Sequence, residues 1–195
     1  MAVKTVKDLE LKNKRVLVRA DFNVPHKEGT ITDDTRIRAA LPTLKYILEQ
    51  EGSSLVLMSH LGRPKGEHKP ELSLAPVGRC LADLLGVPVK TAPDCVGEET
   101  HAMASELKAG EVLLLENLRF HKEETDNDEN FARELAKNGD VYVNDAFGTA
   151  HRAHASTEGV AHLLPGAAGF LIEKEVRFFE HILSNPEKPF VSIIG

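Results

Sequence analysis

The sequence contains little cysteine, and its cysteines do not form a pattern typical of disulfide-stabilised or zinc-binding proteins. Its 195 residues include two cysteines, Cys80 and Cys95, and no CxxC pair. This low count favours a reducing, cytosolic setting over a disulfide framework. Cys80 lies in an apolar helical pattern, so we expect it to be a small buried side chain.

The sequence also lacks a targeting segment and any long apolar run. The N-terminal stretch MAVKTVKDLELKNK has no apolar core of the kind found in signal peptides. No apolar run approaches the roughly 20 residues that a membrane-spanning helix needs. We therefore expect a cytoplasmic protein that does not enter a membrane. The net charge of −6 argues against nucleic-acid binding through overall positive charge.

Three common functional motifs are missing as well. The sequence has no GxxxxGK[ST] of a P-loop, no GxGxxG of a dinucleotide-binding fold and no GxSxG of a serine hydrolase. These residues therefore contain no evident nucleotide site. The length itself predicts about one domain with ample room for an apolar core.

Four apolar runs alternate with helical patterns along the chain. The runs are RVLVRA (15–20), SLVLM (54–58), EVLLLE (111–116) and DVYVN (140–144). They lack polar alternation, which is typical of parallel strands covered on both faces. We therefore predict an α/β fold, a three-layer, doubly wound and mainly parallel sheet with helices on both faces.

The segments between these runs predict helices with recognisable ends. Thr32 or Asp33 can cap the first helix, in which Pro42 should cause a kink or a break. Ser73 can cap the second helix, which ends before Gly86. The other predicted elements are a short strand at 88–91 and helices at 98–108 and 130–138.

Each of the four apolar runs ends at a motif that carries a cation or an amide, namely DFNVP, SHLGRP, NLRFH and DAFGTAHRAH. Open α/β sheets bind ligands beyond the carboxyl ends of their strands, so these motifs should meet in one place. Arg and His side chains in such number suit a small, highly anionic ligand, because the guanidinium fork matches carboxylate and phosphate oxygens. The residues that this fold would gather are Asp21, Asn23, His60, Arg63, Arg119, His121, His151 and Arg152.

Each motif, taken alone, also has an ordinary structural interpretation. Asp21 and Asn23 are typical turn residues. Arg36 lies in the first turn of the following helix, where it could be either a solvated arginine or a ligand for an anion near the helix N-terminus. Arg119 and His121 would face the same side of an extended segment, as in a strand edge with a polar face.

The segment GTAHRAH combines His151, Arg152 and His154 behind a Gly-Thr turn. One His-x-x-His pair without further nearby ligands falls short of a zinc set, so we interpret this segment as an anion-binding loop. Protonation of His60 or His151 near neutral pH would strengthen anion binding. The acidic stretch at 122–134 is most simply a solvated loop and helix face.

The C-terminal stretch differs from the rest of the chain. FLIEKEVRFFEHILSN (170–185) predicts a strongly amphipathic helix, and PFVSIIG (189–195) predicts a further buried strand. An apolar edge strand needs something to cover it. We therefore expect this strand to be the first of a second domain that lies outside this sequence.

Four long blocks of the sequence resemble the phosphoglycerate kinase family. They are RVLVRADFNVP, MSHLGRP, LLENLRFH and GDVYVNDAFGTAHRAH, in that order, and the resemblance extends from about residue 5 to the last residue. It implies reversible, Mg²⁺-dependent phosphoryl transfer between 1,3-bisphosphoglycerate and ADP. It also implies two α/β domains of similar size, of which the first binds the phosphoglycerate and the second binds the nucleotide.

The resemblance implies a role for each candidate residue. Asp21 and Asn23 look like contacts to the glycerate hydroxyl and carboxylate end, and Arg36 looks like the catalytic arginine that reaches the transferring group. A basic patch would hold the 3-phosphate. The patch residues are His60, Arg63, Arg119 and Arg152, and the same motifs place Phe22, Leu61 and Gly62 among the substrate-binding residues.

The sequence departs from the family pattern at its end. Family members continue from the terminal strand into a Gly-Gly-Ala/Ser-Lys segment, whereas this chain stops at Gly195. We therefore expect residues 1–170 to be the phosphoglycerate-binding domain, and residues 171–195 to be an interdomain helix and the first strand of the other domain. Mg-ATP or ADP would serve the complete enzyme, and we expect this chain to bind neither nucleotide nor metal.

Three further expectations concern the chain alone. It should bind 3-phosphoglycerate without turnover, because the partner domain is needed for closure. The complete enzyme should be a monomer, whereas this chain should self-associate through the uncovered helix or have a disordered C-terminus. Two other classes of function stay open, namely a stand-alone module that binds a phosphorylated metabolite without catalysis and a non-catalytic interaction protein that uses the apolar stripe at 170–185.

Overall fold

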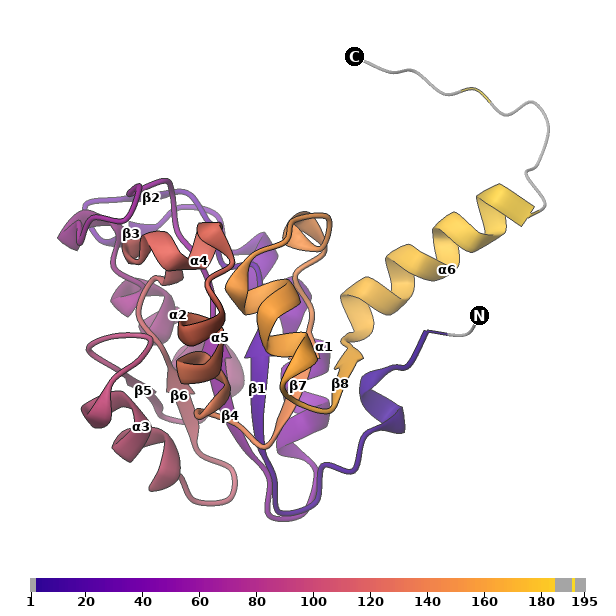
Figure 1. Cartoon of the computed structure of the whole chain (residues 1–195), viewed down its shortest axis with the longest axis horizontal. Helices are drawn as coiled ribbons and strands as arrows, with labels where there is room; N and C mark the ends of the chain where they lie inside the picture. The colour runs from indigo at the N-terminus through magenta and orange to yellow at the C-terminus, as the bar shows by residue number, and fades with distance from the viewer. Residues whose placement is uncertain (1–2, 185–190, 192–195) are drawn as a thin grey trace.

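The computed structural model describes residues 3–184 and residue 191. Its centre is a six-stranded sheet in the order β5-β6-β4-β1-β7-β8, in which every neighbouring pair is parallel (Figure 1). The strands of this sheet are β1 (Arg15–Arg19), β4 (Ser54–Met58), β5 (Val89–Thr91), β6 (Val112–Leu114), β7 (Val141–Asn144) and β8 (Gly166–Ala168). The α/β, mainly parallel architecture predicted from the four apolar runs is thereby confirmed.

The central strands are buried on both faces, as their unbroken apolar sequences require. Leu17 of β1 lies between Val56 of β4 and Tyr142 of β7 in the parallel register, and all three are buried. Its neighbours Val16 and Val18 point to the opposite face, because side chains alternate along a strand. The sheet therefore separates two apolar cores rather than covering one.

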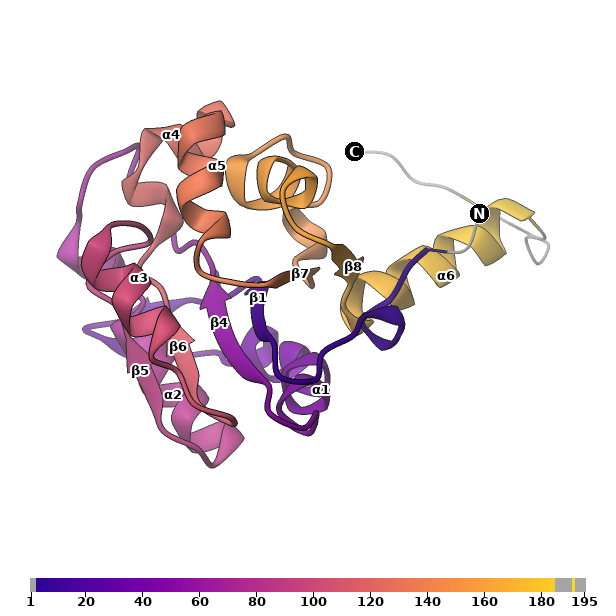
Figure 2. The same ribbon diagram turned by 60° about the horizontal axis from the view of Figure 1, so that its bottom comes forward.

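Helices close both cores, so the molecule has three layers (Figure 2). One face packs on Ile37 and Leu44 of α1 and on Leu81 of α2. The other face packs on Phe131 and Leu135 of α5. The doubly wound arrangement predicted from the sequence is thereby confirmed. The helices are α1 (Thr35–Leu48), α2 (Ala75–Leu85), α3 (Glu98–Ser105), α4 (Lys122–Asp126), α5 (Glu129–Ala136) and α6 (Phe170–Ser184), and a small antiparallel hairpin pairs β2 (His26–Lys27) with β3 (Thr30–Ile31).

Helix α1 continues through Pro42 as a single helix, so the predicted break is wrong. Pro42 lies on the exposed side of the helix, where water can satisfy the carbonyl group that the missing N–H leaves free. On the inner side, Ala40, Thr43 and Leu44 are buried and hold both halves of the helix against the sheet. Packing on the sheet thus outweighs the local cost of the proline.

The expected burial of Cys80 also needs correction. Cys80 is only partly buried, whereas Cys95 is completely buried. Cys80 lies at the margin of the core on the α1 side, because the apolar face of α2 is centred on Val77 and Leu81 rather than on it.

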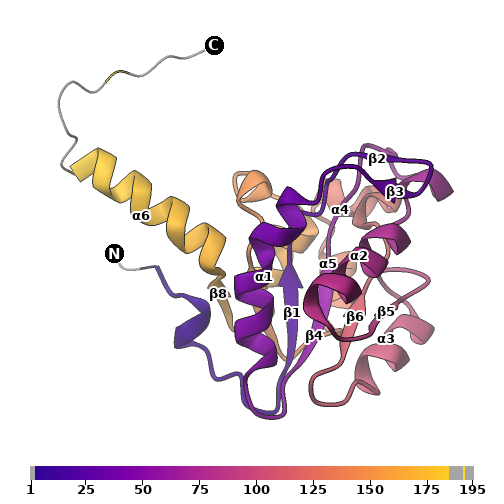
Figure 3. The same cartoon turned by 180° about the vertical axis from the view of Figure 1, so that it is seen from behind.

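Helix α6 projects away from the body of the molecule (Figures 1 and 3). It confirms the predicted amphipathic helix, yet no residue within it is buried. Its first residue, Phe170, packs edge-on against Tyr46 of α1, with ring centroids 5.3 Å apart. Apart from residue 191, the strand predicted at 189–195 lies outside the described residues. No helix in the described part of the chain is long and apolar enough to cross a membrane.

Candidate functional site

The loops that follow β1, β4, β6 and β7 surround a cavity of about 270 Å³ at the carboxyl edge of the sheet. This is where an open parallel sheet offers room for a ligand. The structure brings most of the candidate residues together there. The cavity is lined by Asp21, Asn23, Arg36, His60, Gly62, Arg63, Arg119, Gly148, Thr149 and Arg152.

Asp21 and Asn23, after β1, are fixed by hydrogen bonds within the site. Asn23 donates its backbone N–H to Asp21 Oδ1 at 3.1 Å, and Arg36 Nη1 donates to Asp21 Oδ2 at 2.8 Å. The amide oxygen of Asn23 accepts from the backbone N–H of Gly62 at 2.9 Å. Arg36 keeps 53% of its side chain exposed, so this ion pair leaves part of the guanidinium group available to a ligand.

The glycine of SHLGRP is required by its backbone conformation. Gly62 has φ +63°, and a Cβ atom there would lie 2.9 Å from Leu72 Cδ2. The tight turn lets Arg119 Nη1 donate to the carbonyl oxygen of Gly62 at 2.8 Å. The loop after β4 and the loop after β6 are therefore joined inside the cavity, and Arg63 and Arg119 lie on its wall together.

Arg119 does not lie in an extended segment, so the predicted alternation of Arg119 and His121 is wrong. Residues 118–120 form a turn of 3-10 helix, which the side chain of Asn117 caps by accepting from the backbone N–H of Arg119. The turn directs His121 away from Arg36 and His60. His121 Nε2 bonds Asp94 Oδ1 instead, at 2.6 Å, and this hydrogen bond raises the pKa of His121.

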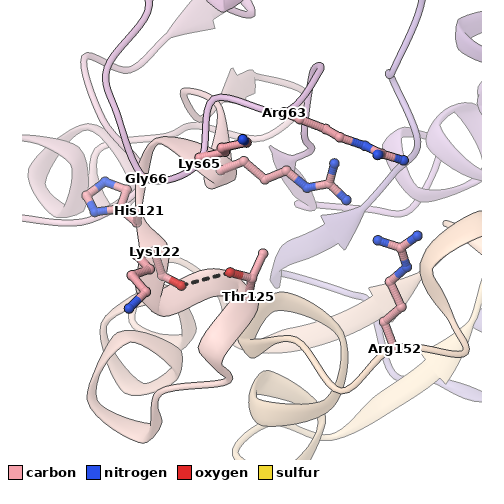
Figure 4. Close-up of a pocket in the computed structure, with 8 residues that line it drawn as sticks. Arg63, Lys65, Gly66, His121, Lys122, Thr125 and Arg152 are labelled. Atoms are coloured by element: carbon pink, nitrogen blue, oxygen red, sulfur yellow. Dashed lines mark hydrogen bonds between the residues drawn. The ribbon is translucent and has the colours of Figure 1, made fainter.

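A second cavity of about 330 Å³ adjoins the first and shares three of its arginines (Figure 4). The guanidinium groups of Arg63 and Arg152 point toward the same open space, and Lys65 and Lys122 also line this cavity. The positive charge of the site is thus broader than predicted. This second cavity is lined by Arg63, Lys65, Gly66, Arg119, His121, Lys122, Thr125 and Arg152.

His60 is 4% exposed and faces the first cavity. Burial, together with the charges of Arg19, Arg119 and Arg152, lowers the pKa of His60 to about 2. His60 is therefore not a histidine that titrates near neutral pH. His151 is exposed and lies on a separate surface hollow, so it does not join the cavity.

Glu124 corrects the expectation that the acidic stretch is solvated throughout. It is 1% exposed and accepts hydrogen bonds from the backbone N–H and the hydroxyl of Ser156, at 2.9 and 2.6 Å. Arg19, at the end of β1, is also 1% exposed. No local pattern marks either residue in the sequence, since the partners that bury each one lie far away along the chain.

Cys95, Asp94 and His121 form a group of metal-binding residue types in the described part of the chain, with ligand atoms within 4.8 Å of one another. The arrangement does not fit a metal ion. Asp94 and His121 are hydrogen-bonded to each other, and the Cys95 thiol donates to the carbonyl oxygen of Glu116 at 2.9 Å. Complete burial also raises the pKa of Cys95 well above its usual value, which opposes the thiolate that a metal requires.

The known proteins that this chain resembles belong to one family. The phosphoglycerate kinase family model matches residues 6–195. The chain is 65% identical to the phosphoglycerate kinase of Moorella thermoacetica and 60% identical to that of Borrelia hermsii. Both matches extend over the whole of this chain, and they cover 49% and 50% of the two relatives. The chain thus spans about half the length of the curated relatives that it matches.

Solved structures give the same result. The structure of phosphoglycerate kinase from Coxiella burnetii matches with a TM-score of 0.83 at 41% identity, over 96% of this chain and 46% of that one. The enzyme from Pyrococcus horikoshii matches with a TM-score of 0.85 at 36% identity, over 95% of this chain and 47% of that one. The chain belongs to the phosphoglycerate kinase family, of which it represents the N-terminal half.

Proposed function

We propose that this chain is the phosphoglycerate-binding half of a phosphoglycerate kinase. The observation that carries the proposal is the convergence of Arg36, Arg63, Arg119 and Arg152 on one cavity that also presents Asp21 and Asn23. Four guanidinium groups favour a ligand with several negative charges. 3-Phosphoglycerate has a phosphate, a carboxylate and a hydroxyl group on three carbons, which suits a cavity of about 270 Å³.

The arrangement of the cavity supports a particular orientation of this ligand. Arg63, Arg119 and Arg152 also line the adjoining cationic cavity, so together they offer the strongest positive charge to the phosphate. Asp21 and Asn23 line the first cavity but not the adjoining one, and they can bond the hydroxyl and carboxylate end. Arg36, held by Asp21, would neutralise charge on a transferring phosphoryl group.

Nucleotide and Mg²⁺ would bind outside this chain. The carboxylate in the cavity, Asp21, is already paired with Arg36, and the remaining charged groups are cations. Mg²⁺ prefers several oxygen ligands, so the residues at this cavity do not fit it. We infer that residues 1–170 form the substrate-binding domain, and that residues 171–195 supply an interdomain helix and the first strand of the nucleotide-binding domain. The chain alone cannot carry out phosphoryl transfer, which requires closure over the substrate.

A calorimetric titration with 3-phosphoglycerate tests the proposal. The wild-type chain should bind with Kd nearer mM than nM, because the open half-site leaves the ligand hydrated, and it should show no turnover with Mg-ATP. Arg119→Ala should weaken binding by about 10- to 100-fold, the cost of one charged hydrogen-bonding group. Arg133→Ala, which removes an exposed arginine of α5, should leave Kd unchanged. Equal affinities of the wild type and Arg119→Ala would contradict the proposal.

A further inference from the structure

We propose that Arg19 is a positioning residue that fixes the neutral Nε2–H tautomer of His60, so that His60 offers the substrate a hydrogen bond without a charge. The role in binding rests on the proposed function, because it needs an anion in the cavity. The tautomer itself is a property of the free protein. It follows from a set of buried contacts behind the cavity wall.

Arg19 lies at the end of β1 and its guanidinium group has three buried partners. Nε donates to Ser156 Oγ at 2.9 Å, Nη1 donates to the carbonyl oxygen of Ala20, and Nη2 lies 3.0 Å from His60 Nδ1. A guanidinium group carries donors only. Nδ1 of His60 must therefore be the acceptor, which places the ring proton on Nε2, the nitrogen left for a ligand.

Glu124 provides the charge that makes a buried arginine possible here. Ser156 Oγ accepts the hydrogen bond from Arg19 Nε and donates one to Glu124 Oε1 at 2.6 Å, so a single hydroxyl group links the two opposite charges. His154 Nδ1 is a further neighbour of Glu124, at 3.8 Å. An arginine held at several points cannot rotate away from His60, so the acceptor role of Nδ1 is permanent.

The same contact opposes protonation of His60. An imidazolium ion would direct an Nδ1–H group at a guanidinium nitrogen only 3.0 Å away, which places two donors against each other. The other charged groups that act on His60 are Arg36, Arg119 and Arg152, all of which disfavour a further positive charge. Arginines thus supply the charge of the site, and His60 supplies a directed donor.

Nitrogen-15 spectra of the histidines in the ligand-free chain test the tautomer. His60 should show a protonated Nε2 and an unprotonated Nδ1 throughout the range from about pH 5 to pH 8, in which an ordinary histidine titrates. This measurement needs no ligand, so it stands even if the proposed function fails. A His60 that gains a second proton in this range, or one that has its proton on Nδ1, would overturn the proposal.

Two variants separate positioning from simple packing. Arg19→Met/Glu124→Gln removes both buried charges together, so that neither is left unpaired. Glu124→Gln alone keeps Arg19 and its bonds to Ser156, Ala20 and His60, but it should unfold at a lower urea concentration because Arg19 loses its opposite charge, so its spectrum is recorded where it is folded. In the double variant, His60 should populate both tautomers and titrate, while in Glu124→Gln it should keep the wild-type spectrum. Wild-type tautomer signals in the double variant would overturn the proposal.

Affinity gives the second readout on the same two proteins. 3-Phosphoglycerate should bind the double variant about tenfold more weakly than Glu124→Gln, the cost of one misdirected hydrogen bond to an anion. Equal affinities, together with an altered tautomer, would overturn the positioning role in binding. If neither the wild type nor Glu124→Gln binds 3-phosphoglycerate, the proposed function is contradicted. The nitrogen-15 spectra then still test the tautomer of His60.

Discussion

Asp145 illustrates how burial alone can set the charge of a single side chain in this protein. It follows β7, is fully buried, and accepts a hydrogen bond at Oδ1 from the backbone N–H of Leu171 at 2.9 Å. Burial raises the pKa of Asp145 to about 6, although hydrogen bonds from Thr43 and from the backbone of α6 act in the opposite direction. The start of α6 is therefore held by a carboxyl group that titrates in mildly acidic solution.

This shift predicts a specific pH dependence of stability. The pKa of Asp145 is higher in the folded state than the usual 3.8, so the folded state binds the proton more tightly. The contribution of Asp145 to the free energy of unfolding should decrease by on the order of 3 kcal/mol as pH rises from about 4 to about 6. Asp145→Asn should lack this contribution. Urea unfolding at several pH values should therefore show that the free energy of unfolding of the variant rises relative to that of the wild type as pH increases from about 4 to about 6.

The control is Asp83→Asn, which changes an exposed carboxyl group on α2. Its unfolding free energy should follow the wild type across the same pH range. Parallel curves for Asp145→Asn and the wild type would show that the carboxyl group of Asp145 has an ordinary pKa in the folded protein.

For single residues, the sequence predicts the site residues that follow the strands better than the charged residues buried behind the cavity. Asp21, Arg63 and Arg152 could be placed together because parallel strands end at one edge. Arg19 and Glu124 could not, because the hydrogen-bond partner of Arg19, Ser156, lies 137 residues away and that of Glu124 lies 32 residues away. No local pattern distinguishes a buried charge from a solvated one.

Asn117 connects two elements of the site, the loops after β4 and β6. It is fully buried, and its amide group donates to the carbonyl oxygens of Leu61 and Leu72 at 2.8 and 2.9 Å. Its Oδ1 accepts from the backbone N–H groups of Leu61 and Arg119. One side chain thus satisfies four backbone groups and fixes the loops that carry Arg63 and Arg119.

Asn117→Ala should therefore lower the free energy of unfolding by about 3 kcal/mol or more, because several buried backbone groups lose their partners together. It should also weaken binding of 3-phosphoglycerate. Asn130→Ala is the matched control, since Asn130 is exposed on α5 and its loss should change stability by no more than about 0.5 kcal/mol. Indistinguishable urea midpoints for the two variants would contradict this role of Asn117.

At the scale of elements, the strands and the amphipathic helices could be predicted because their periodicities are local. The behaviour of the chain at Pro42 and after Asn117 could not. Helix α1 survives its proline through burial of both halves, and residues 118–120 curl into a helical turn because Asn117 caps them. Contacts with distant parts of the molecule decide both, since the sheet holds α1 and the carbonyl groups of Leu61 and Leu72 hold the Asn117 side chain that caps the turn.

For the molecule as a whole, α6 is the feature that the body of the domain does not cover (Figure 3). Phe178 is 60% exposed and Leu183 is 82% exposed, while Phe179 contacts Phe147 with ring centroids 6.1 Å apart. Clustered exposed apolar side chains favour association. Within the described residues, this face is the strongest candidate for contact with another domain or another copy of the chain.

The chain should accordingly self-associate in a concentration-dependent manner. Sedimentation velocity should show a weight-average mass that rises with concentration, and Phe178→Glu should shift the protein toward the monomer. Leu163→Glu is the control, because Leu163 is also an exposed apolar residue but lies outside α6. A wild-type chain that sediments as a monomer at all concentrations would contradict the prediction.

We propose that this half of the family's fold binds 3-phosphoglycerate by itself. Amide chemical shifts recorded during a titration with 3-phosphoglycerate test this proposal most directly. Saturable shifts should cluster at residues 21–23, 60–63, 119 and 152 and should disappear in Arg63→Ala. A well-dispersed spectrum that does not change, or changes that cluster away from the cavity, would contradict it.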